Sequence, residues 1–118
     1  MNKDWKNDCW GCEINDRHER GEMQGVVYDS EHVLAHYVPN SWAEIHIRIQ
    51  TKQHIVSIYD FTAEHNPIAL DLMNAIRVAG DEIIALKGGC ELIMNMGKFQ
   101  NTKHFHCHVA YGVHEGNE

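Results

Sequence analysis

The chain has 118 residues, a length that suits one domain (1–118) with a single hydrophobic core. Its hydrophobic fraction of 43% and charged fraction of 23% are ordinary for a globular protein, and no apolar run approaches the roughly 18 residues of a membrane span. The formal charge of −7 argues against broad nucleic-acid affinity, and the polar start lacks the apolar core of a signal peptide. We therefore expect a cytoplasmic protein with no membrane or nucleic-acid partner.

The N-terminal region is polar and carries one chemical motif, a pair of cysteines. Residues 1–8 are interpreted as a polar arm that frays. Cys9 and Cys12 form a C-x-x-C knuckle, which proteins use for metal binding or for redox chemistry. A thioredoxin-like redox site would follow a buried strand, whereas here the preceding residues are polar except for Trp5, so metal binding is favoured. Residues 13–24 are strongly charged and predict a turn-rich surface excursion.

Five short segments have the composition or the alternation of β-strands. The clearest is residues 45–50, where isoleucines alternate with His46, Arg48 and Gln50. The isoleucine side should face the core, and the three polar side chains should lie on the other face. The remaining strands are predicted at residues 25–28, 32–38, 90–94 and 103–111.

One long helix is predicted over residues 66–87. Asn66 can cap it, Pro67 fits its first turn, and Gly88 can supply a left-handed stop. Apolar residues recur at helical spacing: Ile68, Leu72, Ala75, Ile76, Ala79, Ile83 and Leu86. The pattern as a whole predicts an α+β fold, in which this helix packs on an antiparallel sheet of about five strands.

The last predicted strand carries three histidines at alternate positions, His104, His106 and His108. Residues two apart on a strand share a face, so three imidazoles should stand in a row about 7 Å apart. Such a row can hold a metal ion, bind phosphate or supply a nucleophile. Together with Cys9 and Cys12, two of the chain's histidines would complete a tetrahedral Cys2His2 set that suits structural Zn²⁺.

These motifs resemble the histidine triad (HIT) family of nucleotide-binding hydrolases and transferases. The family signature, His-φ-His-φ-His-φ-φ, fits residues 104–110 at every position. Residues 45–54 are similar to the family segment G-H-x-L-V-I-P-K-x-H and keep both of its histidines, His46 and His54. Further similarities extend the match over nearly the whole chain: residues 28–35 (Y-E-D-E-x-x-L-A in the family), Asn95 with Gly97 (N-x-G), and Gln100.

The resemblance implies a HIT-like fold and a catalytic role for three histidines. His106 matches the family nucleophile, which attacks phosphorus and forms a covalent nucleotidyl-imidazole intermediate. His108 would bind phosphate and the leaving group and take part in proton transfer. His46 would hold the tautomer of the nucleophile through its other nitrogen. The resemblance also assigns phosphate binding to three amide side chains: Asn95, Gln100 and Asn101.

The zinc-binding bacterial branch of the family implies a division of labour among the histidines. Its ligand set maps onto Cys9, Cys12, His54 and His104, so that His104 serves a structural Zn²⁺ while the other two triad histidines serve phosphate. The closed set of four protein ligands leaves no open position for chemistry on the metal. Family members are usually homodimers, and the long helix and Trp42 are the candidate contacts here.

Two departures from the family pattern fall in the nucleoside pocket. The family's L-A-F-x-D is represented by residues 34–38, where His36 replaces an apolar residue of the pocket wall and Val38 replaces the ribose-binding Asp.

Three functional hypotheses remain open. The first is a hydrolase or transferase that cleaves a phosphoanhydride or phosphoramidate bond through His106. The second is a non-catalytic nucleotide- or phosphate-binding regulatory module that keeps the fold and the zinc. The third is a metalloenzyme whose histidine row holds a catalytic metal.

Overall fold

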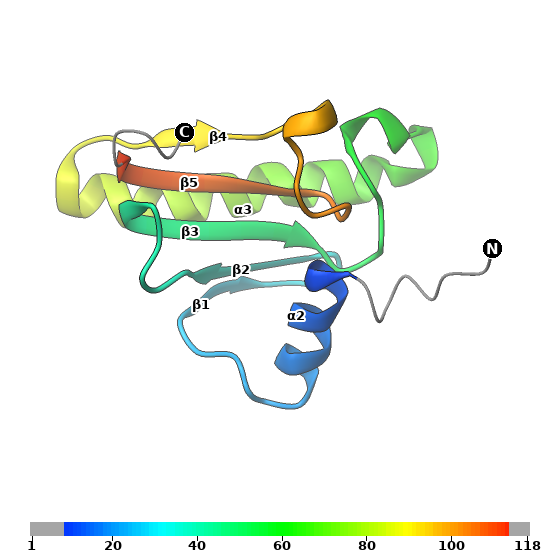
Figure 1. The fold of residues 1–118 in the computed structure, drawn as a ribbon, viewed down its shortest axis with the longest axis horizontal. Coiled ribbons are helices and arrows are strands. Elements are labelled where there is room, and N and C mark those ends of the chain that lie inside the picture. The colour runs from blue at the N-terminus through cyan, green and yellow to red at the C-terminus, as the bar shows by residue number, and fades with distance from the viewer. Residues whose placement is uncertain (1–8, 114–118) are drawn as a thin grey trace.

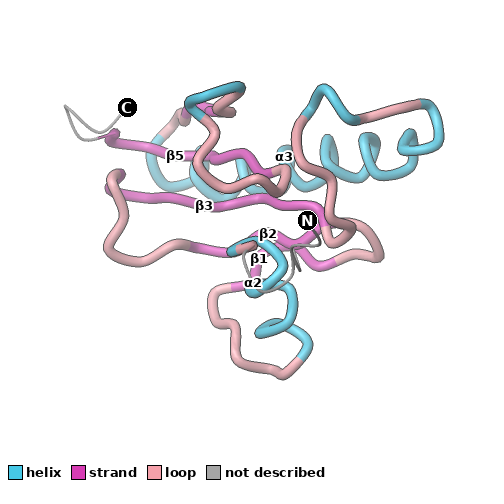
Figure 2. Tube along the Cα trace, turned by 45° about the vertical axis from the view of Figure 1, so that its right-hand side comes forward, coloured by secondary structure: helices cyan, strands magenta, loops and turns pink. Residues whose placement is uncertain are grey.

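The computed structural model describes residues 9–113, and the polar arm expected at residues 1–8 lies outside this range. A five-stranded antiparallel sheet forms the centre, with strand order β1-β2-β3-β5-β4. A long helix, α3 (Asn66–Lys87), crosses one face of the sheet, and a shorter helix, α2 (Trp10–Glu19), lies beside β1, β2 and β3 (Figures 1 and 2). This is the α+β architecture that the sequence predicts. No helix among the described residues is both long enough and apolar enough to cross a membrane.

All five predicted strands are present, with shifted boundaries. The middle strand, β3, pairs with β2 on one side and with β5 on the other. Its isoleucines Ile47 and Ile49 are buried in the core beneath α3, as the alternation predicts. The strands are β1 (Val26–Asp29), β2 (Val33–Tyr37), β3 (Ala43–Thr51), β4 (Glu91–Ile93) and β5 (His106–Val113).

Helix α3 spans Asn66–Lys87, and the glycine after it ends the helix as predicted. Gly88 adopts the left-handed conformation, with a φ of 84°. The prediction that Asn66 caps the helix is wrong, because Asn66 itself has helical dihedral angles and His65 stands at the N-cap without a side-chain cap. A 3-10 turn at Ala63–His65 runs directly into α3, so the helical backbone begins before the expected cap.

The surface excursion predicted at residues 13–24 is wrong as far as Glu19, because Trp10–Glu19 forms helix α2, whereas residues 20–24 form the predicted turn and loop. Cys9 caps this helix, since its Sγ accepts a hydrogen bond from the Cys12 amide at 3.3 Å. Glu13 and Arg17, one turn apart, form an ion pair on the outer face. The helix buries a narrow stripe, Gly11, Cys12 and Ile14, which is too short to stand out among the surrounding charges.

The expected row of three histidines is also corrected, since β5 begins only at His106. His104 lies in the preceding loop, where the amide of Phe105 donates to the Ile55 carbonyl at 2.6 Å instead of extending the ladder with β3. Two triad histidines, His106 and His108, therefore share a sheet face, and the third belongs to a different cluster.

Candidate functional site

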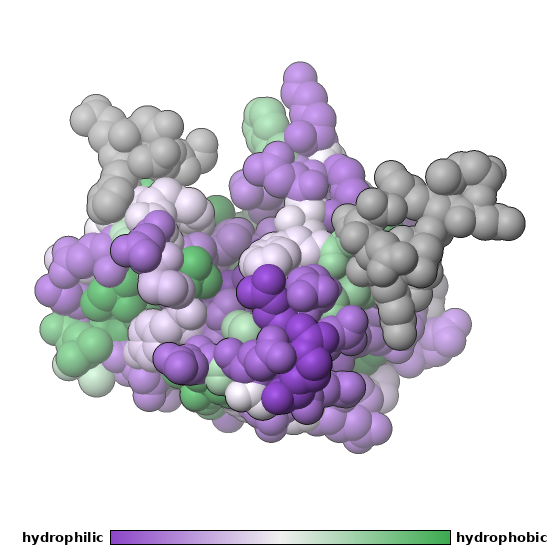
Figure 3. Space-filling view, turned by 60° about the horizontal axis from the view of Figure 1, so that its bottom comes forward, coloured by the Kyte–Doolittle hydropathy of each residue, from purple (hydrophilic) through white to green (hydrophobic). Residues whose placement is uncertain are grey.

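The sheet face opposite α3 carries an unusual concentration of buried polar side chains. The strand register places His36, Arg48 and His108 side by side across β2, β3 and β5, and places Gln50 beside His106. These side chains are all at least nine-tenths buried. Hydrophilic residues also dominate the surface of the molecule on the α2 side (Figure 3). Buried polar groups are costly unless they are paired or used, so this face is the candidate site.

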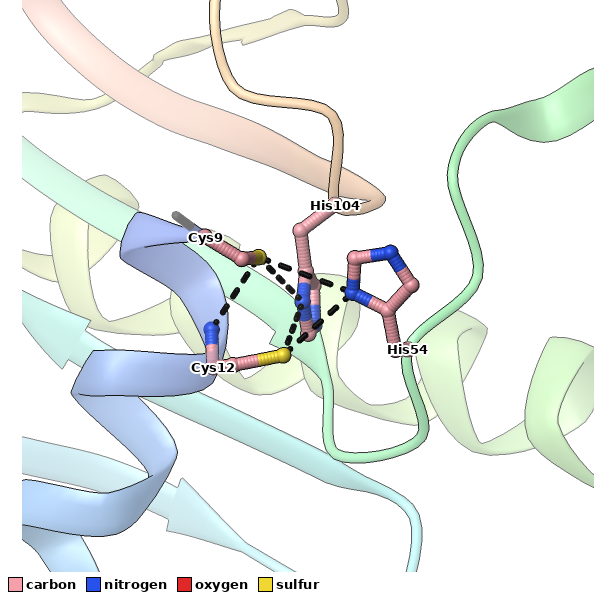
Figure 4. Close-up of side chains that lie close together, drawn as sticks. All are labelled: Cys9, Cys12, His54 and His104. Atoms are coloured by element: carbon pink, nitrogen blue, oxygen red, sulfur yellow. Dashed lines mark hydrogen bonds between the residues drawn. The ribbon is translucent and has the colours of Figure 1, made fainter. Parts of the chain in front are cut away.

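At one end of this face, four side chains form a cluster that could hold a metal ion: Cys9, Cys12, His54 and His104. Figure 4 shows them converging from the start of α2 and from two separate loops. Their ligand atoms all lie within 4.8 Å of one another. Each thiol Sγ lies 3.3–3.5 Å from the Nδ1 atoms of both histidines. Standard Zn–S and Zn–N bond lengths in a tetrahedron give about 3.5 Å for the same separation, so the donors fit zinc.

The surroundings of His104 prepare it to be a ligand. Its Nε2–H donates to the Thr51 carbonyl at 2.6 Å, which leaves the Nδ1 lone pair directed at the two thiols. Gly11 lies against the same ring, and a Cβ at that position would come within 2.4 Å of the ring carbon Cγ. Three local features thus fix the position of the His104 ring: the C-x-x-C spacing, the start of α2, and a glycine at the point of contact.

His106 is held in one tautomer by the backbone. Its Nδ1 donates to the carbonyl oxygen of His104 at 2.8 Å, and because a carbonyl only accepts, the proton must reside on Nδ1. The other ring nitrogen, Nε2, then carries the lone pair in the neutral ring. Burial lowers the pKa of His106 to about 4, and the nearby Arg48 charge adds to the effect.

His46 and His108 form a hydrogen-bonded pair, with Nε2 of His46 lying 2.8 Å from Nδ1 of His108. Burial lowers the pKa of His46 to about 4 and that of His108 to about 3. We expected His46 to orient the nucleophile, but it contacts His108 instead, and the His104 carbonyl orients His106. Trp42, the candidate dimer contact, packs beside this pair: the centroid of its ring lies 4.5 Å from that of His46 and 5.3 Å from that of His108.

Arg48 is a buried residue of this face whose burial the sequence did not predict. The alternation along β3 predicted only that its side chain lies on the face opposite the core. Its Nε donates to Oε1 of Gln50 at 3.0 Å, and Nη2 is buried without a hydrogen-bond partner in the described chain. Gln50 is fixed in turn, because its amide nitrogen donates to the Gly11 carbonyl and to Oδ1 of Asn15, at 2.7 and 2.9 Å.

The three amide residues expected to bind phosphate differ in burial and in their hydrogen bonds. The Gln100 side chain is buried and donates to the backbone carbonyls of Val56 and Thr102, at 2.6 and 2.9 Å. Asn95 and Asn101 are exposed. The structure thus shows Gln100 supporting the loop before the triad, while the two asparagines face solvent.

The chain is similar to one known protein family and to several solved structures. The family described as "Scavenger mRNA decapping enzyme C-term binding" matches residues 8–118. A histidine triad protein from Clostridium difficile has 28% sequence identity and a TM-score of 0.72, with 100% of this chain and 99% of that chain covered. A HIT family hydrolase from Clostridium thermocellum has 25% identity and a TM-score of 0.73, with coverages of 92% and 96%. A HIT family member from Bacillus subtilis has 26% identity and a TM-score of 0.72, with coverages of 93% and 77%.

Proposed function

Because this chain belongs to the histidine triad family, we propose that it is a hydrolase or transferase that cleaves a phosphoanhydride or phosphoramidate bond through a covalent intermediate on His106. The observation that carries the proposal is the 2.8 Å hydrogen bond from His106 Nδ1 to the His104 carbonyl. That bond keeps the proton on Nδ1, so that Nε2 of the neutral ring carries the lone pair needed for attack. A covalent intermediate divides one difficult displacement into two easier ones.

In the first step, His106 Nε2 attacks phosphorus, and the bond from phosphorus to the leaving oxygen or nitrogen breaks. The leaving group takes a proton from His108, which carries one while the phosphate is bound, since a neighbouring anion favours the charged ring. In the second step, water attacks phosphorus, the P–N bond to His106 breaks, and the proton of the water returns to His108. His46 holds His108 throughout by the 2.8 Å hydrogen bond between the two rings.

We propose zinc as the ion of the Cys2His2 cluster, with Cys9, Cys12, His54 and His104 as its ligands. Two thiolates and two imidazoles form a closed set typical of structural zinc, which supplies rigidity rather than a reactive position. The third hypothesis, a catalytic metal on the histidine row, gains no support from the arrangement. His104 turns to the thiols, and neither His106 nor His108 belongs to the metal-binding group found in the described chain.

The test is turnover by the zinc-containing protein on a panel of adenosine phosphoramidate, aminoacyl-adenylates, dinucleoside polyphosphates and non-nucleoside phosphoramidates. His106→Ala should abolish turnover while the zinc content stays near one per chain. An alkaline quench followed by mass spectrometry should find the adduct on His106 in the wild type. His32→Ala is the control, since within residues 9–113 the contact recorded for that ring is a 3.8 Å ion pair with Glu31.

Absence of turnover on every member, with fold and zinc intact, would favour the second candidate, a binding module. The feature behind that candidate is the nucleoside pocket, where Val38 lacks a side-chain acceptor for ribose hydroxyls.

A further inference from the structure

We propose that Arg48, flanked by His36 and His108, binds a second acidic group on the substrate, beside the phosphate held by the triad. The proposal rests on the proposed function, because it takes His106 and His108 as the site of the phosphate. It adds the substrate class: a phosphorylated compound with a carboxylate or a second phosphate a few atoms from the reacting phosphorus.

The first argument is the charge of Arg48. Arg48 is 7% exposed, and no ion pair to its guanidinium is found in the part of the chain that the structure describes. Burial lowers its pKa only to about 10, so the group is still cationic at neutral pH. Its side-chain partner, Gln50, is a neutral amide. Proteins rarely bury a charge in this way, because an unpaired buried ion is costly to keep out of water.

The second argument is the grouping of unpaired atoms. Within residues 9–113, three buried side-chain nitrogens have no hydrogen-bond partner: His36 Nε2, His46 Nδ1 and Arg48 Nη2. All three belong to the same sheet face. His36 and Arg48 are direct cross-strand partners, and His46 precedes Arg48 by two positions on β3. Unsatisfied buried groups scattered by chance would not converge beside the triad, and their convergence indicates a bound ligand group.

The chemistry of these atoms defines the group they would bind. A guanidinium offers a planar fork of donors that matches a carboxylate or a phosphate. His36 donates from Nδ1 to the Tyr37 carbonyl at 3.1 Å, so Nε2 of the neutral ring accepts, which suits a hydroxyl next to the acid.

The position of the group follows from the register. Arg48 is the cross-strand partner of His108. Paired residues on antiparallel strands have Cβ atoms about 4.5–5.5 Å apart. A single small molecule with its two acidic groups separated by a few bonds could therefore contact both residues.

The experiment compares two phosphonates of the same shape by isothermal titration calorimetry on the zinc-containing full chain. One is 3-phosphonopropionate, and the other is 3-phosphonopropionamide, which lacks the second charge. We expect the diacid to bind at least about tenfold more tightly, in the range found for a hydrogen-bonded charge. Arg48→Leu should reduce this ratio to near one without weakening the amide. A second diacid, 1,2-ethylenediphosphonate, shows whether carboxylate or phosphate is preferred.

Each outcome bears on one proposal. Equal affinities for diacid and amide in the wild type, with binding of both lost in His108→Ala, would overturn the second acidic site and leave the triad site standing. Binding of neither phosphonate to the wild type would overturn the second acidic site, whereas the proposed function is decided separately by the turnover panel. Arg48→Gln and His36→Phe are further variants, should Arg48→Leu fold poorly. Arg48→Lys should restore part of the preference, because it keeps the charge but not the planar fork.

Discussion

Nδ1 of His106 lies 2.8 Å from the backbone carbonyl oxygen of His104, while the side chain of His104 belongs to the Cys2His2 cluster. One residue thus contributes to two sites, with its carbonyl orienting the proposed nucleophile and its imidazole contributing a candidate metal ligand. The Cys2His2 cluster and the triad are therefore connected through a single residue. Loss of the metal should disturb the orientation of His106 even though the metal takes no part in the chemistry.

The first prediction concerns Cys12→Ser, which removes one of the two thiols. We expect the zinc content to fall well below one per chain, and the free energy of unfolding to fall by more than about 2 kcal/mol. The helix α2 loses its connection to the loops that carry His54 and His104. Elemental analysis and urea denaturation measure the two effects.

Cys90→Ser is the matched control for that variant. Cys90 is half-buried and does not belong to the metal-binding group. The substitution should leave the zinc content unchanged. Zinc retained by Cys12→Ser would show that the cluster is not the binding site, and zinc lost from Cys90→Ser would show that the loss is not specific to the cluster.

A second prediction compares two glycines on helices. The Cβ introduced by Gly11→Ala would lie 2.4–2.8 Å from ring atoms of His104, so the imidazole must shift from its position beside the thiols. We expect weaker zinc binding and a less stable protein. Gly80→Ala places its Cβ in open space on α3 and should stabilise the protein by up to about 1 kcal/mol. A chelator competition assay and thermal unfolding distinguish the two. A Gly11→Ala protein with unchanged zinc affinity would contradict the close approach.

The main elements of the fold could be predicted because their patterns are long and regular. The alternation of β3 identified which side of the sheet faces α3, and the helical spacing of Ile68 to Ile83 identified the buried side of that helix. The cysteine and histidine spacings, read through the family resemblance, brought together the four residues that cluster in the structure.

Other features depend on tertiary contacts that no local pattern carries. Helix α2 escaped prediction because its buried stripe is three residues long and its stability comes from packing against His104 and Gln50. The partner of His106 is a backbone carbonyl, which no side-chain motif can reveal. Arg48 looked like an exposed residue, because an arginine opposite the core usually faces solvent.

A third prediction concerns pH. His46 and His108 have pKa values of about 4 and about 3 in the folded protein, below the ordinary histidine value near 6.5 that applies on unfolding. Between those values the unfolded chain binds more protons than the folded one, so stability is fully present above pH 6.5 and falls as the pH drops toward 4. The urea midpoint should decrease over this window.

His46→Gln separates this contribution from acid release of the metal, which affects both proteins alike. The variant has one proton-binding ring fewer on unfolding, so its urea midpoint should depend less steeply on pH between 6.5 and 4. Parallel curves for wild type and His46→Gln would show that the neutral His46 ring does not contribute.

The last prediction is that Arg48→Met stabilises the protein. The variant removes a buried cation that has no ion pair among the described residues, and it fills the space with an unbranched apolar chain. The variant no longer has to desolvate the guanidinium on folding, and this saving should exceed the free energy lost with the hydrogen bond to Gln50. We therefore expect the free energy of unfolding to rise by about 1 kcal/mol. Ile49→Met, at the next residue but facing the core, is the control and should cost less than about 1.5 kcal/mol. If Arg48→Met instead destabilised the protein more than the control, Arg48 would be a structural residue. If Arg48 is present to bind a ligand, we expect it to lower the stability of the fold, and its replacement by an apolar residue should then raise that stability.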